Sequence, residues 1–228
     1  MTTEQRNLST AERLDWLRLI RSENVGPITF FRLLERFGSA KAALDALPSL
    51  ARKGGRAKPI RIATLAQAKT ELEANAKLGA HLVAAVEPGY PTPLRAIDDP
   101  PPLISVRGSL PLLNKPAIAI VGARNASAAG CKFTRMLAAD LGRAGLIVVS
   151  GMARGVDSAA HEAALNTGTI AVLAGGVDHI YPPENASLYE TLSEAGAIVA
   201  ELPPGTVPQA SFFPRRNRII SGLGLGVV

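Results

Sequence analysis

The stretch that decides the fold is AIAIVGARNASAAGCKFTRMLAADLGRAGLIVVS, residues 117–150. It begins with the apolar run Ala117–Val121, passes through a glycine-containing turn into a segment with helical periodicity, Ala129–Ala144, and ends in a second apolar run, Leu146–Val149. Short, continuously apolar runs on either side of one helix are typical of parallel strands that are covered on both faces. The stretch therefore predicts a β-α-β unit.

The same alternation of apolar runs and helical segments continues toward the C-terminus. The expected elements are a helix at Ser158–Leu165, a strand at Ile170–Leu173, a helix at Ala186–Glu194, a strand at Ile198–Ala200, and a further helix or strand from Ile219 onward. Two short apolar runs, 81–86 and 103–106, precede the unit and are joined by the Pro- and Gly-rich segment 87–102. We expect an α/β fold with a Rossmann-like, doubly wound, mainly parallel sheet.

Residues 1–82 have a different pattern, in which apolar side chains recur at helical spacing. Two apolar faces are expected, at Leu14, Leu17 and Ile20 and at Phe30, Leu33, Leu34 and Phe37. Gly38 is suited to end one helix and Ser39 to begin the next, and residues 65–78 form a further helix. We predict a small all-helical domain over residues 1–82, followed by the sheet domain over residues 83–228.

The segment Val25–Leu44 resembles helix-hairpin-helix modules, whose tight turn offers backbone N–H groups to a DNA phosphate. We therefore describe the first domain as SAM-like or helix-hairpin-helix-like. Asn24 stands where such hairpins usually have their first glycine. A phosphate contact and a purely structural or partner-binding role both remain open for this domain.

The composition excludes several classes of protein. No apolar run reaches the roughly eighteen residues that a membrane span needs. The single Cys131 cannot form an internal disulfide, which fits a reducing compartment, and we expect a cytoplasmic protein with no membrane association. The histidines His81, His161 and His179 are scattered and lack metal-ligand spacing, so no metal site is expected.

The positive charge is concentrated in the first third of the chain. Residues 1–85 contain 14 Lys and Arg against 8 Asp and Glu, a net charge of +6, whereas residues 86–228 contain 11 of each. The run 52–61 carries five of these basic residues and no acidic one. A basic surface of this kind favours nucleic acid, although the Gly and Pro residues in the run also fit a flexible, soluble loop.

Three turns that follow predicted strands carry arginine and backbone N–H groups suited to anions. They are Gly122–Ser127 (GARNAS), Ser150–Ser158 (SGMARGVDS) and the arginine cluster Arg215–Arg218 (RRNR). Carboxyl ends of parallel strands share one edge of a sheet, so these turns are expected to form one phosphate-binding site. The arginine cluster itself is interpreted either as a phosphate-binding fork without a neutralising carboxylate or as a solvated turn before a buried strand.

The same turns exclude familiar nucleotide and catalytic motifs. GARNAS does not match the GxGxxG pattern of dinucleotide sites, and no P-loop pattern occurs. Ser150 lacks the context of a nucleophile elbow, and Asp157 with His161 is interpreted as a capping pair that fixes the turn. We expect no catalytic residue and no cofactor.

Aromatic residues near these turns have two interpretations. Tyr181 is interpreted as a core residue with a satisfied hydroxyl. Phe212 and Phe213, beside the arginine cluster, are either core residues or platforms on which nucleobases stack.

Four motifs in register, IAIVGARNAS, VVSGMARGVDSAAH, TIAVLAGGVDHIYPPEN and FPRRNRIISGL, together with the upstream YPTPLRAIDDPPPLISVRG, resemble the DNA-processing protein A family (DprA, also called Smf). The resemblance implies a cytoplasmic protein that binds single-stranded DNA, protects incoming strands in natural transformation and loads the RecA recombinase on them. It also implies a homodimer formed through the Rossmann domain and a further small domain beyond Val228. The run Gly224–Val228 looks like the opening of another strand, so we expect a truncated chain.

Matching motif positions carries the DNA contacts of that family onto this chain. Arg124 is then the leading contact and Phe213 the stacking ring. The other contacts implied are Gly122, Ala123, Ser127, Ser150, Gly151, Arg154, Arg216, Asn217 and Arg218. The chain departs from the family pattern at Pro183–Glu184, where many relatives carry a basic residue, and at Ala123, where Ser or Thr is frequent.

Two other functions compete with single-stranded DNA binding. A nucleotide phosphoribohydrolase of the lysine-decarboxylase-like type has a similar sheet, but its PGGxGTxxE signature has only a near match here, Ala174–Asp178, without the GT or the spaced glutamate. A partner-binding scaffold is the third alternative. We expect a non-catalytic protein that binds single-stranded DNA.

Overall fold

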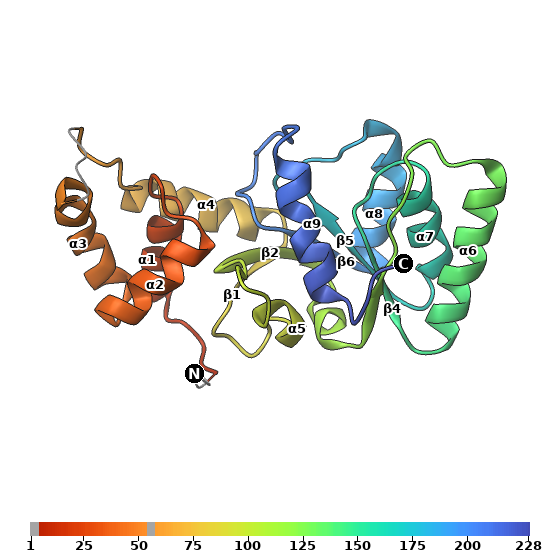
Figure 1. Ribbon diagram of the computed structural model, residues 1–228, viewed down its shortest axis with the longest axis horizontal. Helices are drawn as coiled ribbons and strands as arrows, with labels where there is room; N and C mark the ends of the chain where they lie inside the picture. Colours follow the sequence, from red (N-terminus) through yellow and green to blue (C-terminus); the bar gives the residue numbers. More distant parts are fainter. Residues whose placement is uncertain (1–4, 54–57) are drawn as a thin grey trace.

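The computed structural model describes residues 5–53 and 58–228 of the chain, and Figure 1 shows a helical domain beside a larger α/β domain. Of the basic run 52–61, residues 54–57 lie outside the described residues. The prediction of an α/β fold preceded by a small helical domain is confirmed.

The helical domain is built from helices whose ends carry the expected capping residues. The helices are α1 (Thr10–Ile20), α2 (Pro27–Phe37), α3 (Ala40–Lys53) and α4 (Leu65–Lys77). Gly38 ends α2 in the left-handed conformation at a φ of 76°, which glycine adopts without steric cost. The Ser39 hydroxyl then accepts the backbone N–H of Ala42. Trp16 and Phe30 meet edge-to-face, with ring centroids 4.9 Å apart, and join α1 to α2.

The described residues of the α/β domain contain one six-stranded sheet in the order β1-β2-β6-β5-β4-β3. The strands are β1 (Ala80–Ala84), β2 (Leu103–Gly108), β3 (Ala117–Ala119), β4 (Ile147–Ser150), β5 (Thr169–Leu173) and β6 (Ala197–Ala200). Strands β3 to β6 are parallel to one another, whereas β1 and β2 are antiparallel to their neighbours. Residues 225–228 continue the sheet beyond β3, because Leu225 donates to the Ala117 carbonyl and Val228 to that of Ala119.

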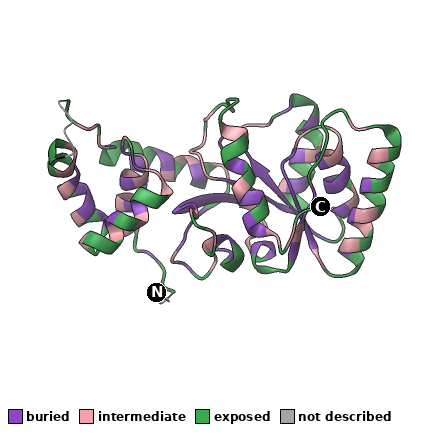
Figure 2. Ribbon diagram, viewed as in Figure 1, coloured by how far each residue is buried: buried purple, intermediate pink, exposed green. Residues whose placement is uncertain are grey.

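Helices cover both faces of this sheet. The connecting helices are α5 (Thr92–Arg95), α6 (Ala128–Arg143), α7 (Val156–Ala164), α8 (Ala186–Ala195) and α9 (Phe212–Leu223), with short 3-10 turns at Leu110–Asn114 and Pro183–Asn185. Side chains alternate along each strand, so Val148 packs with α6 and α7 while Val149 packs with α9 on the other face. Figure 2 shows the strands buried and the helices exposed on their outer sides.

The predicted boundaries hold to within a few residues except near the C-terminus. The segment from Phe212 to Leu223 is a single helix, α9, so the arginine cluster lies within its first two turns. The interpretation of this cluster as a turn before a buried strand was therefore wrong. The predicted domain boundary between residues 82 and 83 falls inside β1.

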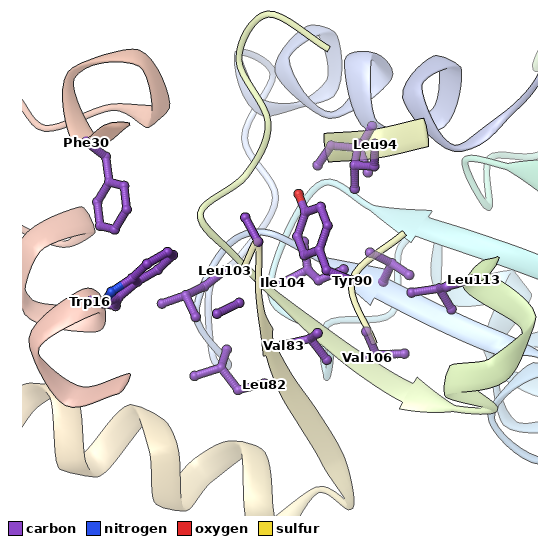
Figure 3. Close-up of a cluster of buried hydrophobic side chains, with 14 of the residues drawn as sticks. Trp16, Phe30, Leu82, Val83, Tyr90, Leu94, Leu103, Ile104, Val106 and Leu113 are labelled. Carbon is purple, nitrogen blue, oxygen red and sulfur yellow. The ribbon is translucent and has the colours of Figure 1, made fainter. Parts of the chain in front are cut away.

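One hydrophobic core connects the two domains. Trp16 and Phe30 of the helical domain belong to the same buried cluster as Leu82 of β1 and Leu103 of β2 (Figure 3). The helical domain is therefore packed on the β1–β2 side of the sheet.

A buried ion pair reinforces this junction. The Glu87 carboxylate lies 2.5 Å from the Arg13 guanidinium and accepts the backbone N–H groups of Leu8 and Ala84. Arg13 also donates to the Leu82 carbonyl. Because every one of these groups is paired, their interactions offset the desolvation cost of burying the carboxylate.

Replacing Glu87 should destabilise the protein strongly. Glu87→Ala leaves Arg13 and two backbone N–H groups without their partner, and we expect the free energy of unfolding to fall by about 3–5 kcal/mol. Denaturant titration measures this loss. The control is Glu162→Ala, which breaks the exposed pair with Arg135 and should cost about 1 kcal/mol or less. Equal losses in the two variants would contradict the role given to Glu87.

Candidate nucleic-acid interface

A cleft of about 430 Å³ lies at the carboxyl edge of the parallel strands. It is lined by Val121, Gly122, Arg124, Ala153, Asp157, Phe213, Arg216, Asn217, Arg218, Ile220, Ser221 and Val227. The lining thus combines the turn after β3, the turn after β4 and the first half of α9. The structure brings all three sequence-predicted turns together at one place.

The turn after β3 presents an exposed cation beside a helix N-terminus. The Ser127 hydroxyl accepts the backbone N–H of Gly130 and caps α6, which begins one residue before the predicted helix. The carbonyl of Ala123 accepts the N–H of Val156, which ties this turn to the start of α7. The Arg124 side chain is exposed, and within residues 5–53 and 58–228 it forms no ion pair.

The turn after β4 is held by a buried carboxylate. Asp157 accepts the backbone N–H groups of Gly151 and Ala153 at 3.1 and 3.2 Å. Its burial raises the pKa of the Asp157 carboxyl. The residue before α7 is Gly155, without a side-chain cap, so Asp157 fixes the turn, as expected from the sequence, but does not cap the helix.

The cleft is lined by none of the three contacts predicted in this turn, Ser150, Gly151 and Arg154. Ser150 is fully buried, and its hydroxyl donates to the Ile120 carbonyl at 2.6 Å. The hydroxyl contact expected from Ser150 does not fit this position. Arg154 is exposed and lies 3.6 Å from Glu184, on the loop before α8.

Arg216 serves the fold at the floor of the cleft. Its guanidinium is buried and donates to the Gly151 carbonyl at 2.7 Å and to the Val172 carbonyl. A Cβ atom on Gly151 would lie 2.5 Å from this guanidinium, so a larger residue there would force the guanidinium to shift from its place against these carbonyls. Burial lowers the pKa of Arg216 to about 10, although the nearby Asp157 carboxylate acts in the opposite direction and raises this pKa.

Arg218 is neutralised by carboxylates that lie far away in the sequence. It lies 3.1 Å from Asp99 and 2.6 Å from Glu201, and it also donates to the Asp99 backbone carbonyl. The expectation that no carboxylate neutralises the arginine cluster was therefore wrong. Glu201 directly follows β6, so its place at a strand end was a signal in the sequence, whereas nothing in the local pattern pointed to Asp99.

Aromatic rings and guanidinium groups stack beside the cleft. The Arg124 guanidinium lies 5.1 Å from the Phe213 ring centroid, and that of Arg216 lies 6.0 Å from it. The Tyr181 ring contacts the same phenylalanine, with centroids 5.6 Å apart. Tyr181 is 45% exposed, so its interpretation as a core residue was wrong.

The pair Asp157 and His161 does not form a reactive dyad. His161 is fully buried, and its Nδ1 lies 2.7 Å from the Thr169 hydroxyl. Since that hydroxyl donates to the Val148 carbonyl, Nδ1 carries the proton and donates to Thr169. The Nε2 atom is buried without a partner among the described residues. Burial, and after it the positive charge of Arg216, lowers the pKa of His161 to about 3, so the ring is neutral.

Neither a metal-binding cluster nor a membrane-spanning helix is found in the part of the chain that the structure describes. No group of three or more His, Cys, Asp or Glu side chains in this part could hold a metal ion. None of its helices combines the length and the apolar character that crossing a bilayer requires. What the cleft offers a ligand is an exposed guanidinium, backbone and amide donors, and aromatic surface.

Removing the buried guanidinium should unfold the site. Arg216→Met leaves the carbonyls of Gly151 and Val172 unpaired beside the Asp157 carboxylate, and we expect a loss of about 3–5 kcal/mol in unfolding free energy. The neighbouring Arg215 is exposed, so Arg215→Met should change stability by about 0.5 kcal/mol or less. Denaturant titration of both variants checks the contrast. Wild-type stability in Arg216→Met would contradict it.

His161 should make stability depend on pH. Its ring is neutral in the folded protein but is protonated below about pH 6.5 in the unfolded chain. Stability is therefore complete above pH 6.5 and is lost as the pH falls toward 3. We expect His161 to account for about 2 kcal/mol of the loss between pH 7 and pH 5. His161→Asn should remove this part of the slope, and an unchanged slope in thermal or denaturant unfolding would contradict the assignment.

Comparison with known proteins agrees with this architecture. The family model described as DNA recombination-mediator protein A matches residues 81–228, and the DprA-like N-terminal HHH domain model matches residues 10–74. The Smf protein of Synechocystis is 33% identical over 97% of this chain and 58% of its own length. The chain spans about half the length of the curated relatives it matches.

Two solved structures resemble the chain as well. The crystal structure of DNA processing protein A from Streptococcus pneumoniae has a TM-score of 0.74 and 30% identity, covering 97% of this chain and 77% of that one. DNA processing protein A from Helicobacter pylori, whose structure concerns a single-stranded DNA binding mode, has a TM-score of 0.57 and 33% identity over 60% of this chain and 64% of that one. Together with the family models, these matches show that the chain belongs to the DprA/Smf family of DNA-processing proteins.

Proposed function

We propose that this chain binds single-stranded DNA in the cleft at the carboxyl edge of its sheet and acts in DNA processing during transformation and recombination. One observation carries the proposal: Arg124 is an exposed guanidinium, free of carboxylates among the described residues, held on the ring of Phe213 at the cleft. Membership of the DprA/Smf family and the single-stranded DNA binding of the Helicobacter pylori relative support it.

The phosphate oxygens are the first part of a DNA strand that the cleft is suited to bind. A planar guanidinium donates two parallel N–H bonds to one phosphate. The charge of an exposed guanidinium without a carboxylate partner remains available for this contact. Arg124 lies in the turn that leads into the N-terminus of α6, where the helix dipole also favours negative charge. Gly122, Ala123 and Ser127 belong to the same turn and are the donors proposed to accompany it.

Aromatic surface is the second element, and it favours a single strand over a duplex. The bases of a duplex keep their faces stacked on one another, whereas a single strand can place them on protein rings. Phe213 lies at the cleft between two guanidinium groups, and Asn217 is exposed one turn further along α9. We therefore expect little dependence on base sequence and a strong dependence on salt.

The remaining predicted residues have different roles in this proposal. Arg216 and Arg218 shape the cleft wall from buried or paired positions, and Gly151 makes room for the first of them. Ser150 belongs to the scaffold. Arg154, at the edge of the site, is available to DNA once its exposed pair with Glu184 opens.

The wider role follows from the family and extends the proposal. We propose that the protein acts in the cytoplasm without catalysing a reaction, protects incoming strands, forms a homodimer through its Rossmann domain and loads RecA on the bound DNA. Strand protection needs only binding, which is the role proposed here for the cleft.

Replacing Arg124 should weaken DNA binding without affecting the fold. For Arg124→Ala we expect about a tenfold loss of affinity for labelled oligo-dT, because one charge-assisted phosphate contact is lost. The slope of log K against log salt should fall by about 0.7, as for one phosphate of a single strand. Fluorescence anisotropy over a salt series, with oligo-dT and a duplex of the same length, measures both quantities.

The matched control is Arg135→Ala, which removes an equally exposed arginine that lies on α6 and pairs with Glu162. It should leave oligo-dT affinity close to that of the wild type. Equal losses in the two variants, or equal binding of duplex and single strand by the wild type, would contradict the proposed cleft.

A further inference from the structure

Tyr181 continues the aromatic surface of the cleft outward. It lies on the loop between β5 and α8, its ring is 45% exposed, and it contacts Phe213. We propose that Tyr181 is a base-stacking residue, which receives an unstacked nucleobase of the strand whose phosphates Arg124 holds. This inference rests on the proposed function and adds to it a residue that binds the base.

The exposure of this ring sets Tyr181 apart from the other tyrosines of the chain. The other two tyrosines, Tyr90 and Tyr189, are buried, and their hydroxyls donate to the carbonyls of Pro101 and Val177. Tyr181 forms no such bond among the described residues. A large ring left half in water, next to a cationic cleft, is the arrangement that single-strand binders use for stacking.

Phe213 has less free surface to offer than Tyr181. Two guanidinium groups lie within 6.0 Å of its ring centroid, and the Tyr181 ring packs on it at an interplanar angle of 57°. A base that stacked on the side of Phe213 covered by Arg124 would have to displace that guanidinium. Tyr181 offers its exposed surface without this competition.

The loop that carries Tyr181 is anchored to the cleft. Asn185 is buried, and its side-chain amide donates to the Met152 carbonyl at 2.8 Å and to the Ser158 hydroxyl at 3.0 Å. These bonds join the loop to the turn after β4 and to α7. The loop is thereby anchored close to Tyr181 before a ligand arrives, and the ring itself packs against Phe213, which lowers the entropy cost of binding.

The charge around Tyr181 suits a base better than a phosphate. Glu184, three residues further along the loop, lies 3.6 Å from Arg154 and balances its charge. With Arg154 paired, the guanidinium that a phosphate can bind without breaking an ion pair of the described residues is that of Arg124. A neutral nucleobase meets no repulsion on the Tyr181 side.

The test compares normal and abasic single strands. Anisotropy titrations use oligo-dT and an abasic oligonucleotide of the same length, with the wild type, Tyr181→Ala and Tyr181→Phe. Stacking contributes about 1–3 kcal/mol per base, so Tyr181→Ala should bind oligo-dT between about 5-fold and 150-fold more weakly. It should bind the abasic strand as the wild type does. Tyr181→Phe keeps the ring and should bind oligo-dT normally.

Phe133→Ala is the matched control, since Phe133 is a 59% exposed ring on α6 that does not line the cleft. It should leave both affinities unchanged. The salt slope of Tyr181→Ala should equal that of the wild type, because stacking releases no counterions. Thermal unfolding confirms that each variant is folded.

A second measurement needs no variant. Oligonucleotides containing 5-iodouracil are cross-linked to the wild type, and cleavage after glutamate separates Tyr181 from Phe213 because Glu184 lies between them. A cross-link at Tyr181 supports the inference. Binding of oligo-dT with no cross-link at Tyr181, or with unchanged affinity in Tyr181→Ala, overturns the role of Tyr181 but leaves the proposed function standing. No binding of either strand by the wild type overturns the proposed function as well.

Discussion

The candidate site depends on one buried interaction, the contact of the Arg216 guanidinium with the carbonyls of Gly151 and Val172. A buried charge is tolerated only when its donors are paired, so α9 has to meet β4 and β5 in one defined position. Many α/β proteins leave this strand-end position open for a ligand. Here the protein fills it with its own side chain, and the cleft forms beside that side chain.

This constraint separates the arginines into two groups, according to whether a phosphate has to break an existing interaction in order to bind them. Arg216 and Arg218 are buried or paired, so their charge is used in holding α9 against the sheet and against Glu201. Arg124 remains exposed on the ring of Phe213, and a phosphate can bind it without breaking any ion pair of the described residues. Composition alone cannot distinguish the two groups, because all three residues are the same amino acid in apparently similar surroundings.

The helical domain is part of the same hydrophobic core but does not line the cleft. Its Trp16 packs in a cluster that includes β1 and β2, and Arg13 pairs with the buried Glu87. The cleft lies instead beyond β3 and β4, and its lining residues all come from residues 121–227. Packing of the helical domain on β1 and β2 therefore fixes the position of this domain relative to the cleft, which lies at the other end of the sheet.

The sequence by itself determined the alternation of strands and helices, the end of α2 at Gly38, the start of α6 at Ser127 and the meeting of three turns at one sheet edge. These follow from local periodicity, capping and the shared direction of parallel strands. Only the tertiary structure decided that α9 begins at Phe212, that Asp99 neutralises Arg218 across 119 positions, and that Tyr181 is exposed. Neutralisation and exposure depend on contacts between distant segments, which no local pattern of residues encodes.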